Sequence, residues 1–254
     1  MFPSRMITTM GGEKLSDQYS MYFDATNNNR VNCGSDSSLD ATTSDFSVCA
    51  WFNAEADGAT NYYWPIVSKG GSLSSDDNGW AINIVQGSGV PFRVYFDTQD
   101  GSGGRESAIS DADVGSYGVW NHVAGVYDNT GDKLYVYLNG VLLDTDTSAG
   151  LDDIGDGSVN FYIGNDQDSR DFKGHISDVA FYKGVVLSQS DIYTLYNGRE
   201  PYNHKEGVAS TYLKGWWRMG DGTEGGSGST VYDMSGNGND GTVENGPVFS
   251  AETR

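Results

Sequence analysis

Apolar and polar positions alternate with a period of two over much of this chain. The clearest case is the segment KLYVYLNG at 133–140, where Leu134, Val136 and Leu138 are separated by other side chains. Such alternation puts the apolar side chains on one face of a strand and the rest on the opposite face. The pattern predicts strands that bury one face and partly expose the other, as antiparallel sandwiches require.

Strand signals recur about every ten residues, and clusters of Gly, Asn, Asp and Ser separate them. Asn139 and Gly140, between two apolar strands, predict a two-residue hairpin with positive φ at both positions. The predicted strands lie at 20–24, 30–34, 45–54, 62–69, 79–86, 91–98, 119–128, 133–140, 141–146, 158–164, 175–183, 212–219 and 241–245.

One segment, LSQSDIYTLYNG at 187–198, has the signals of a helix. Ser188 can cap its start, Asp191 completes a capping box, and Gly198 is a typical stop. We therefore expect one short helix near 189–197. Its apolar side should close one end of the sandwich.

The composition agrees with a sheet protein. The 254 residues include 35 Gly, 16 Tyr, 10 Phe and 6 Trp, which suits many tight turns and cross-strand aromatic packing. We expect an all-β, two-sheet antiparallel sandwich over 20–254, preceded by a polar arm at 1–19. The segment 211–247 is too short to bury a core alone, so its aromatic strand YLKGWWRM must pair with the main sheet.

The formal charge of −20 excludes some partners. A chain this acidic repels phosphate backbones, so no nucleic acid partner is expected. The N-terminus has no apolar run typical of a signal peptide, and no segment predicts membrane insertion. We expect synthesis in a cytoplasm and exit without classical secretion. In that setting Cys33 and Cys49 favour packed free thiols over a disulfide bridge.

Several segments resemble the laminin-G-like group of concanavalin A-type lectin-glucanase jelly-roll domains. They are YFDATNNNRVNCG, DFSVCAWFNAE with Trp51, GVWNHVAGVYDNTGDKLYVYLNGVLLDT with Trp120 and His122, and FKGHISDVAFYKGVVLSQSDIYTLYNG. The resemblance covers about residues 20–247 and implies a jelly-roll sandwich.

The order of the segments differs from that group's usual order. There, the aromatic strand and a loop like DMSGNGNDGT, at 233–242, come before the YFD segment; here they follow the predicted helix. The resemblance therefore implies a circular permutation, which adjacent chain termini make easy. Similar permuted, stand-alone chains resemble virion structural proteins of tailed phages.

The residues give no sign of catalysis. Glucanases of this fold type need two carboxylates on alternate positions of one strand. Glu55 and Asp57 come closest, in FNAEADGAT, but this stretch is typical of a loop. His122, His175 and His204 are scattered without metal-ligand spacing. We expect no enzyme activity and assign no catalytic residues.

Two loops carry oxygen ligands that suit calcium. Calcium is the one cofactor for which the sequence offers candidate ligands. The first loop has two alternative interpretations, a calcium site and a tight turn whose side chains bond their own backbone. In the second, a bound cation or solvent could offset the crowded carboxylates. The candidate ligands are Asp233, Asn237 and Asn239 in the first loop, and Asn165, Asp166, Asp168 and Asp171 in the second.

A glycan site would need exposed aromatic rings beside hydrogen-bonding groups. Asn61, Tyr62, Tyr63 and Trp64 form such a group in the sequence. The alternative is that these rings pack along an edge strand.

We expect a non-enzymatic structural protein of a bacteriophage virion, a capsid decoration or fibre component. It would lie on the virion surface, contact capsid or tail proteins and form a homo-oligomer. Its arm would attach through apolar side chains, namely Phe2, Met6, Ile7 and Met10. The alternative is a carbohydrate-binding lectin module for host-surface glycans, with an extracellular location.

Overall fold

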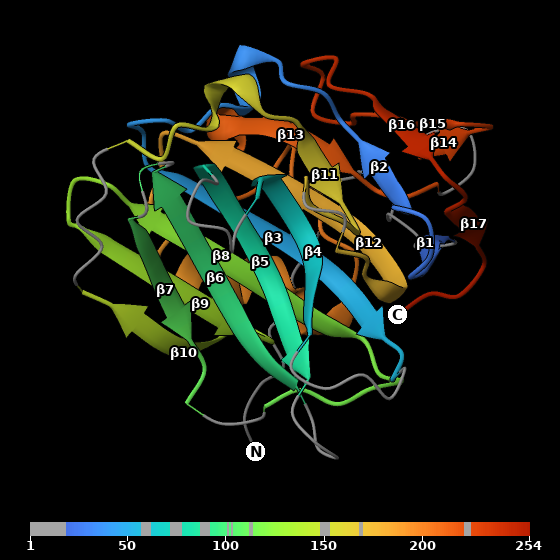
Figure 1. Cartoon of the computed structure of the whole chain (residues 1–254), viewed down its shortest axis with the longest axis horizontal. Coiled ribbons are helices and arrows are strands. Elements are labelled where there is room, and N and C mark those ends of the chain that lie inside the picture. The colour runs from blue at the N-terminus through green and yellow to red at the C-terminus, as the bar shows by residue number, and fades with distance from the viewer. Residues whose placement is uncertain are drawn as a thin grey trace, which may run out of the picture.

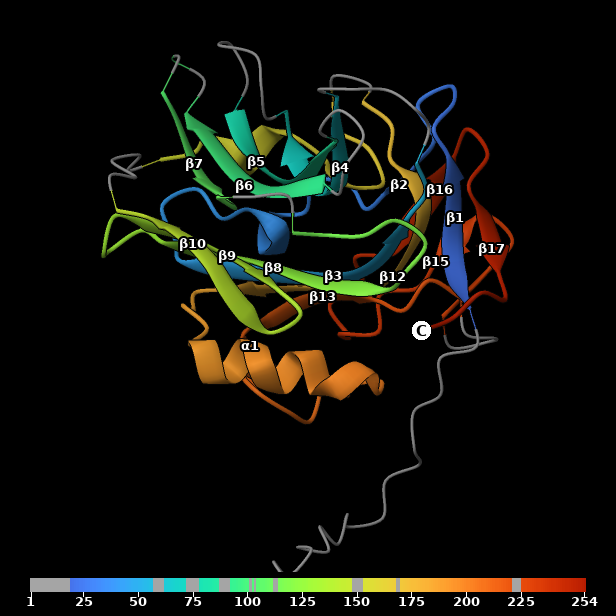
Figure 2. The same ribbon diagram turned by 90° about the horizontal axis from the view of Figure 1, so that it is seen from below.

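The computed structural model of this chain is a sandwich of two antiparallel sheets. It describes residues 19–56, 62–71, 78–86, 92–100, 102, 104–111, 114–147, 153–167, 170–220 and 225–254. Figure 1 shows the strands of the two sheets, and Figure 2 shows the sheets face to face, with the helix α1 (Gln189–Tyr196) on the outer side of one of them. The predicted all-β, two-sheet antiparallel fold is confirmed.

Sheet A has β12 at its centre. One edge of β12 pairs with β3, and the other edge pairs with both β1 and β13. In spatial order the strands are β10 (Val141–Asp146), β9 (Lys133–Leu138), β8 (Asn121–Asp128), β3 (Phe46–Ala54), β12 (Lys173–Lys183), β1 (Ser20–Asp24) and β17 (Val248–Ser250), with β13 (Leu213–Trp217) also beside β12.

Sheet B packs against sheet A across the core. Its strands are β14 (Gly226–Ser227), β15 (Thr230–Val231), β16 (Gly241–Glu244), β2 (Arg30–Asn32), β11 (Phe161–Ile163), β4 (Tyr63–Gly70), β5 (Asn78–Gln86), β6 (Phe92–Asp100) and β7 (Arg105–Ile109), in spatial order. Four 3₁₀ turns lie in the described connections, at Ser37–Leu39, Asp156–Ser158, Asn197–Arg199 and Ser210–Tyr212.

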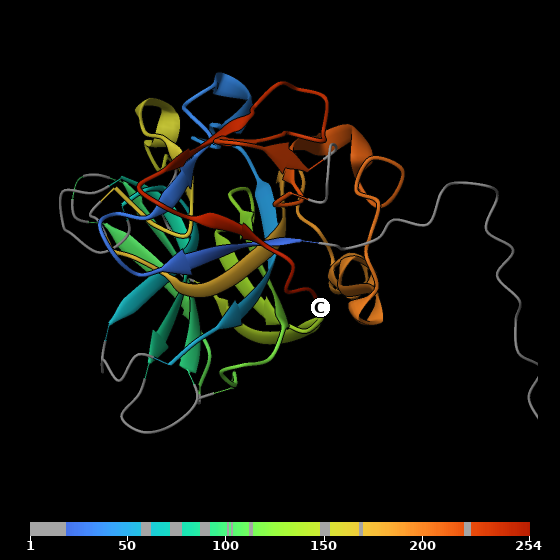
Figure 3. The ribbon, with the colours of Figure 1, turned by 90° about the vertical axis from the view of Figure 1, so that its right-hand side faces the viewer.

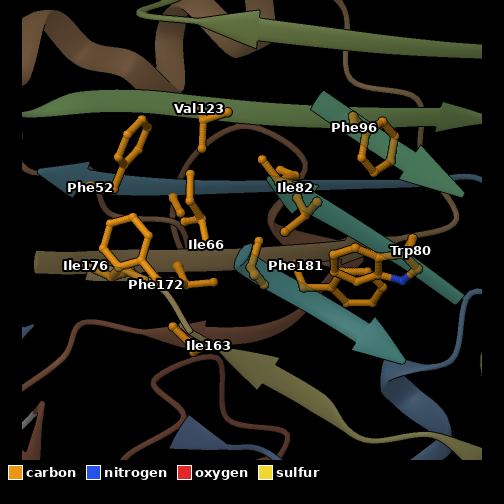
Figure 4. Packing of buried hydrophobic residues seen from close by; sticks show 14 of the residues in the cluster. Phe52, Ile66, Trp80, Ile82, Phe96, Val123, Ile163, Phe172, Ile176 and Phe181 are labelled. Atoms are coloured by element: carbon orange, nitrogen blue, oxygen red, sulfur yellow. The ribbon is translucent and has the colours of Figure 1, made fainter. Parts of the chain in front are cut away.

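The aromatic residues fill the space between the sheets. Trp80 of β5 and Phe181 of β12 lie parallel, with ring centroids 5.7 Å apart, and Phe46 of β3 packs against both. Figure 4 shows Trp80 and Phe181 meeting in this way, with Ile82 and Phe96 nearby. Parallel and edge-on ring contacts at these distances add to the energy of burial.

The residues after the helix complete both sheets. In β13, Trp216 and Trp217 lie opposite Ala180 and Val179 of β12. Further along, β16 pairs with β2 in sheet B, and β17 pairs with β1 in sheet A. Figure 3 shows β1, in blue, with β17, in red, beside it. The aromatic strand thus pairs with the main sheet; a circular permutation as its origin stays a prediction.

The hairpin and the capping box form as the sequence predicts. Asn139 and Gly140 have φ of 51° and 77°. Ser188 Oγ accepts a hydrogen bond from the backbone N–H of Asp191. The Asp191 carboxylate in turn accepts one from the backbone N–H of Ser188. Asn197, with φ of 48°, ends the helix one residue before the predicted Gly198.

The predicted position of the helix is wrong. Ile192 and Leu195 of α1 pack on the outer face of sheet A, against Tyr182 and Trp216, rather than at an end of the sandwich. This outer face carries apolar side chains that need a cover, and the helix supplies it. No described helix is long and apolar enough to cross a membrane.

Two edge strands on the same side of the sandwich are tied to each other. Asp144 and Asp146 of β10, in sheet A, accept from the backbone N–H groups of Ile109 and Ser107 of β7, in sheet B, at 2.8 and 3.2 Å. Hydrogen bonds to charged groups are stronger than those between neutral groups. The two sheets are therefore joined by polar contacts at this side as well as by the core.

Both cysteines are free and buried. Burial raises the pKa of Cys33 and of Cys49 well above the usual range. Thiols in this state are poor nucleophiles, so both act as small packing groups.

Trp217 tests the contribution of the residues after the helix. Its side chain is fully buried, its ring centroid lies 4.9 Å from that of Phe161, and its Nε1 donates to Asn239 O at 2.7 Å. We expect Trp217→Ala to lower the free energy of unfolding by about 3–5 kcal/mol, measured by urea denaturation. The exposed Tyr212 is the control, and Tyr212→Ala should change this free energy by less than about 0.5 kcal/mol. Equal effects of the two substitutions would contradict the packing described.

The buried His122 should make the stability of the fold sensitive to acid. Burial is the main cause that lowers its pKa to about 3, whereas an unfolded chain has a histidine pKa near 6.5. Between these values the folded state binds fewer protons, so the stability present above pH 6.5 is lost as the pH falls. We expect His122→Gln to reduce the slope of unfolding free energy with pH by about 1.4 kcal/mol per unit in this interval. If the free energies of unfolding of the two proteins, measured by urea denaturation, changed with pH in parallel, this expectation would be refuted.

Candidate functional site

The outer face of sheet B, away from the core, carries polar side chains at its centre. Along β6, Val94 and Phe96 point into the core. Side chains of a strand alternate between its faces, so Tyr95, Asp97 and Gln99 lie on the outer face. Tyr95 is partly exposed, whereas Asp97 and Gln99 are buried despite their position.

The sheet register brings the partners of Asp97 together. Ser107 of β7 lies directly opposite Asp97, and Asn83 of β5 lies opposite Tyr95. Asp97 Oδ2 accepts from Asn83 Nδ2 at 2.9 Å, and Oδ1 accepts from Ser107 Oγ at 2.5 Å and from Arg105 Nη2 at 2.8 Å. We call Asn83, Asp97, Arg105 and Ser107 the Asp97 cluster.

Two tyrosines flank the Asp97 cluster. Tyr63 of β4 and Tyr95 lie edge to face, with ring centroids 5.4 Å apart. The guanidinium carbon of Arg105 lies 5.9 Å from the centre of the Tyr63 ring. Tyr63, Tyr95 and Arg105 are each partly exposed. The face therefore combines aromatic rings with fixed hydrogen-bonding groups.

Burial and the ion pair control the charges of the cluster. Burial raises the pKa of Asp97, while the Arg105 charge and the bonds from Ser107 and Asn83 oppose this rise. Burial acts to lower the pKa of Arg105, but the Asp97 carboxylate outweighs it and raises this pKa. Arg105 thus stays positively charged, and its Nε–H has no acceptor among the described residues. This Nε–H is buried, so only the outer part of the partly exposed guanidinium faces solvent.

The glycan candidates divide between surface and core. Asn61 lies outside the described residues; Tyr62 is 43% exposed, and Tyr63 belongs to the tyrosine pair above. The prediction that Trp64 belongs to an exposed aromatic platform is wrong. It is 1% exposed, because alternation along β4 turns it into the core, where it packs edge-on against Tyr117.

In the loop at 165–171, the carboxylates of Asp166 and Asp171 are bound by protein donors, whereas Asn165 Oδ1 is buried without a partner among the described residues. Asp166 accepts from Arg170 Nη1 at 2.6 Å, and Asp171 accepts from Asn165 Nδ2 at 2.6 Å and from the Asn29 backbone at 3.0 Å. Asp168 lies outside the described residues. An arginine and amide groups therefore offset the crowded carboxylates that led us to consider a cation here.

The loop at 233–242 has the hydrogen bonds of a tight turn. Asp233 accepts from the backbones of Trp216 and Asn239, both at 3.0 Å, and from that of Ser235 at 2.8 Å. Asn237 donates to Leu213 O, and Asn239 to Lys214 O. These contacts favour the tight-turn interpretation. Within the described ranges, no three His, Cys, Asp or Glu side chains gather as a metal site would require.

The remaining candidates lie mostly outside the described residues. Glu55 accepts from Tyr22 Oη at 3.3 Å, and its neighbour Asp57 lies outside the described residues. The arm residues also lie outside them, namely Phe2, Met6, Ile7 and Met10.

Sequence reasoning missed the Asp97 cluster. Asn83 stands between two isoleucines in AINIV, and Asp97 follows Phe96 in YFDT. Such positions are typical of a solvent-facing strand surface. Only strand pairing shows that they meet. A usable signal was a carboxylate and an amide in the middle of two strongly apolar neighbouring strands.

The family comparison agrees with this architecture. Residues 23–193 match the model described as the concanavalin A-like lectin/glucanases superfamily, named Laminin_G_3. This chain belongs to that superfamily. The resemblance expected from the sequence is confirmed, and the match ends within α1, so residues 194–254 lie beyond it. A comparison with curated proteins finds no match.

Solved structures share the fold of this superfamily member. A candidate carbohydrate-binding protein from Bacteroides ovatus has a TM-score of 0.63 at 18% identity over 93% of this chain, which spans 60% of that protein. The heptameric SAP-like pentraxin of Limulus polyphemus has a TM-score of 0.59 at 16% identity, covering 92% of this chain and 94% of its own. The Ruminococcus gnavus IT-sialidase CBM40, bound to α2,3-sialyllactose, has a TM-score of 0.51 at 16% identity. The match covers 73% of this chain and 97% of that module.

Asp233 distinguishes a structural turn from a calcium loop. We expect Asp233→Ala to lower the free energy of unfolding by about 1.5–3 kcal/mol, because the backbone donors that it caps lose a charged acceptor. The thermal midpoint of the wild-type protein should be the same with EDTA and with added calcium. An EDTA-dependent fall of this midpoint that is absent in Asp233→Ala would instead show a calcium site in this loop.

Proposed function

We propose that this protein is a carbohydrate-binding module that holds a saccharide on the outer face of sheet B. The observation that carries this proposal is the Asp97 cluster beside Tyr63 and Tyr95. Ligand sites commonly combine aromatic side chains with a few precisely placed polar groups.

The chemistry of a sugar suits this face. The apolar C–H side of a pyranose ring packs on partly exposed aromatic rings, while its hydroxyls need fixed donors and acceptors. Asp97 fixes the orientation of Arg105 and Ser107, so that little side-chain freedom is lost on binding. The Arg105 side chain is partly exposed, so its guanidinium can meet a ligand on this face.

The comparisons support the same proposal. Both the candidate carbohydrate-binding protein and the sialyllactose-bound module share the fold of this chain. These likenesses are at the level of fold, and fold alone does not fix function. They favour the class of ligand, while the Asp97 cluster favours the place where it binds.

We further propose that binding occurs without hydrolysis. Glycoside hydrolysis requires one carboxyl group as acid and a second as nucleophile or base. Asp97, the carboxylate at the centre of this face, bonds Arg105 and Ser107 through one oxygen and Asn83 through the other. A carboxylate held in this way is suited to positioning neighbours rather than to transferring protons.

The virion role expected from the sequence stays a prediction. Neither the family match nor the structural relatives bear on a capsid, a tail or a location in a particle. A lectin module displayed on a virion surface would have both roles, so the virion hypothesis and the carbohydrate-binding hypothesis are compatible.

Glycan binding is directly testable. We expect the wild-type protein to bind a defined set of saccharides on a glycan array. In titration calorimetry with the best of these, Tyr63→Ala and Tyr95→Ala should each weaken binding by about 0.5–1.5 kcal/mol, up to about tenfold in Kd.

Tyr193 provides the matched control, because it is an exposed tyrosine on α1, on the other side of the molecule. Tyr193→Ala should leave the affinity unchanged. Absence of array binding by a folded protein would refute the proposed function, and equal losses for all three variants would refute its location.

A further inference from the structure

The outer face of sheet A carries a second polar and aromatic surface, next to the part covered by α1. On β3, Trp51 and Asn53 point away from the core, and they lie opposite Ser177 and His175 of β12. On the other side, Trp51 lies opposite His122 of β8. This surface is far from the Asp97 cluster, since the core separates the two sheets.

Glu252 is held on this surface by three contacts. Its Oε1 accepts from Asn53 Nδ2 at 2.8 Å, and its Oε2 lies 3.1 Å from His175 Nε2. Its backbone oxygen accepts from Ser20 Oγ at 2.7 Å. Both the side chain and the backbone of this residue are therefore recognised.

Arg254 is held two residues further on. Its guanidinium carbon lies 4.6 Å from the centre of the Trp51 ring, and its Nη2 donates to Asp178 Oδ2 at 3.0 Å. The ring of Tyr196 stacks on that of Trp51. The Arg254 side chain is only 1% exposed. A cation on a tryptophan face, paired with a buried carboxylate, is a specific mode of guanidinium recognition.

Asp178 is positioned for this role by the backbone. A bulge interrupts the pairing of β12 with β3 between Ser177 and Ala180, and Asp178 there has φ of 52°. This left-handed conformation is unfavourable for a non-glycine residue and is often found at functional positions. Trp216 Nε1 donates to Asp178 Oδ1 at 2.6 Å, which fixes the carboxylate.

Residues 252–254 leave polar groups of this surface unused. Four side-chain atoms have no hydrogen-bond partner in the part of the chain that the structure describes: Asn53 Oδ1, Trp120 Nε1, His122 Nδ1 and Ser177 Oγ. None of the four residues is more than 8% exposed. Buried polar atoms without partners are unfavourable. Asn53, Ser177 and His122 lie on neighbouring strands of this face. Their atoms are buried with residues 252–254 in place, so a ligand can reach them only when that segment is displaced.

We propose that this surface is a peptide-binding site for a chain with a carboxylate and a guanidinium two residues apart, and that residues 252–254 occupy it in the free protein. The peptide class follows from the occupant. Positions i and i+2 of an extended chain point to the same side, as the side chains of Glu252 and Arg254 do here. The surface also binds a peptide backbone, because Ser20 Oγ donates to the carbonyl oxygen of Glu252.

The experiment opens the site in the full chain and then supplies the peptide. The opened protein carries Glu252→Ala and Arg254→Ala, and the probe is a fluorescently labelled peptide of residues 248–254, VFSAETR. We expect anisotropy titration to give a Kd at least tenfold lower for the opened protein than for wild type, where the attached segment competes at high effective concentration. A probe with alanine in place of its Glu and Arg should bind the opened protein at least tenfold more weakly.

The matched control is Asp132→Ala with Lys133→Ala, which removes an exposed acid and a partly exposed base at the turn between β8 and β9; it should bind the peptide as wild type does. Adding Asn53→Ala to the opened protein should weaken binding. If the opened protein does not fold, Glu252→Gln replaces it, with a smaller gain over wild type expected. A folded variant that binds no better than wild type, or binds both peptides equally, would overturn the proposal.

Discussion

One edge of β12 serves two partner strands from distant parts of the chain, and the sandwich depends on this shared edge. The first half pairs with β1, from Lys173 to Ile176, and the second half with β13, from Val179 to Tyr182. The change of partner falls at Ser177 and Asp178, where the bulge and the positive φ occur. The extra residue of this bulge bends the strand locally, at the point where its partner on the other edge changes.

This bend links the packing of the sheet to its outer surface. Asp178 binds Trp216 of β13 and the guanidinium of Arg254, and it lies 3.6 Å from His204 Nε2. Burial alone would raise the pKa of Asp178, but Arg254 and His204 outweigh burial and lower it. A buried carboxylate with such partners is costly to leave unpaired. The residues after the helix are therefore held by charge as well as by strand pairing.

Local signals in the sequence predicted the larger elements, and long-range pairing decided the rest. The alternation in KLYVYL, the Asn139–Gly140 turn and the Ser188 capping box each act over a few residues, so they can be recognised without the fold. The strands β7, β14, β15 and β17 escaped prediction because their sequences show no clear alternation of apolar and polar residues. They exist because a neighbouring strand supplies partners for their backbone.

The candidate sites show the same division. Trp64 and Tyr63 are adjacent in sequence, and nothing in YYWP indicates which ring faces the core. Asn83, Asp97 and Ser107 come from three strands, so only the register places them around one carboxylate. Asp166 shows the reverse case: its partner Arg170 was within four residues, yet the surrounding acidic residues suggested a cation.

The bonds between β10 and β7 bear on how copies of this protein meet each other. An open strand edge invites a second molecule to extend the sheet, which is a common route to aggregation. Here two N–H groups of β7 already bind the carboxylates of Asp144 and Asp146. An incoming strand would have to displace a charged acceptor at each, and would meet the same negative charge on the approaching copy. The acidic composition, which first appeared as a bulk property, thus becomes at this edge a local barrier to the growth of a sheet between molecules.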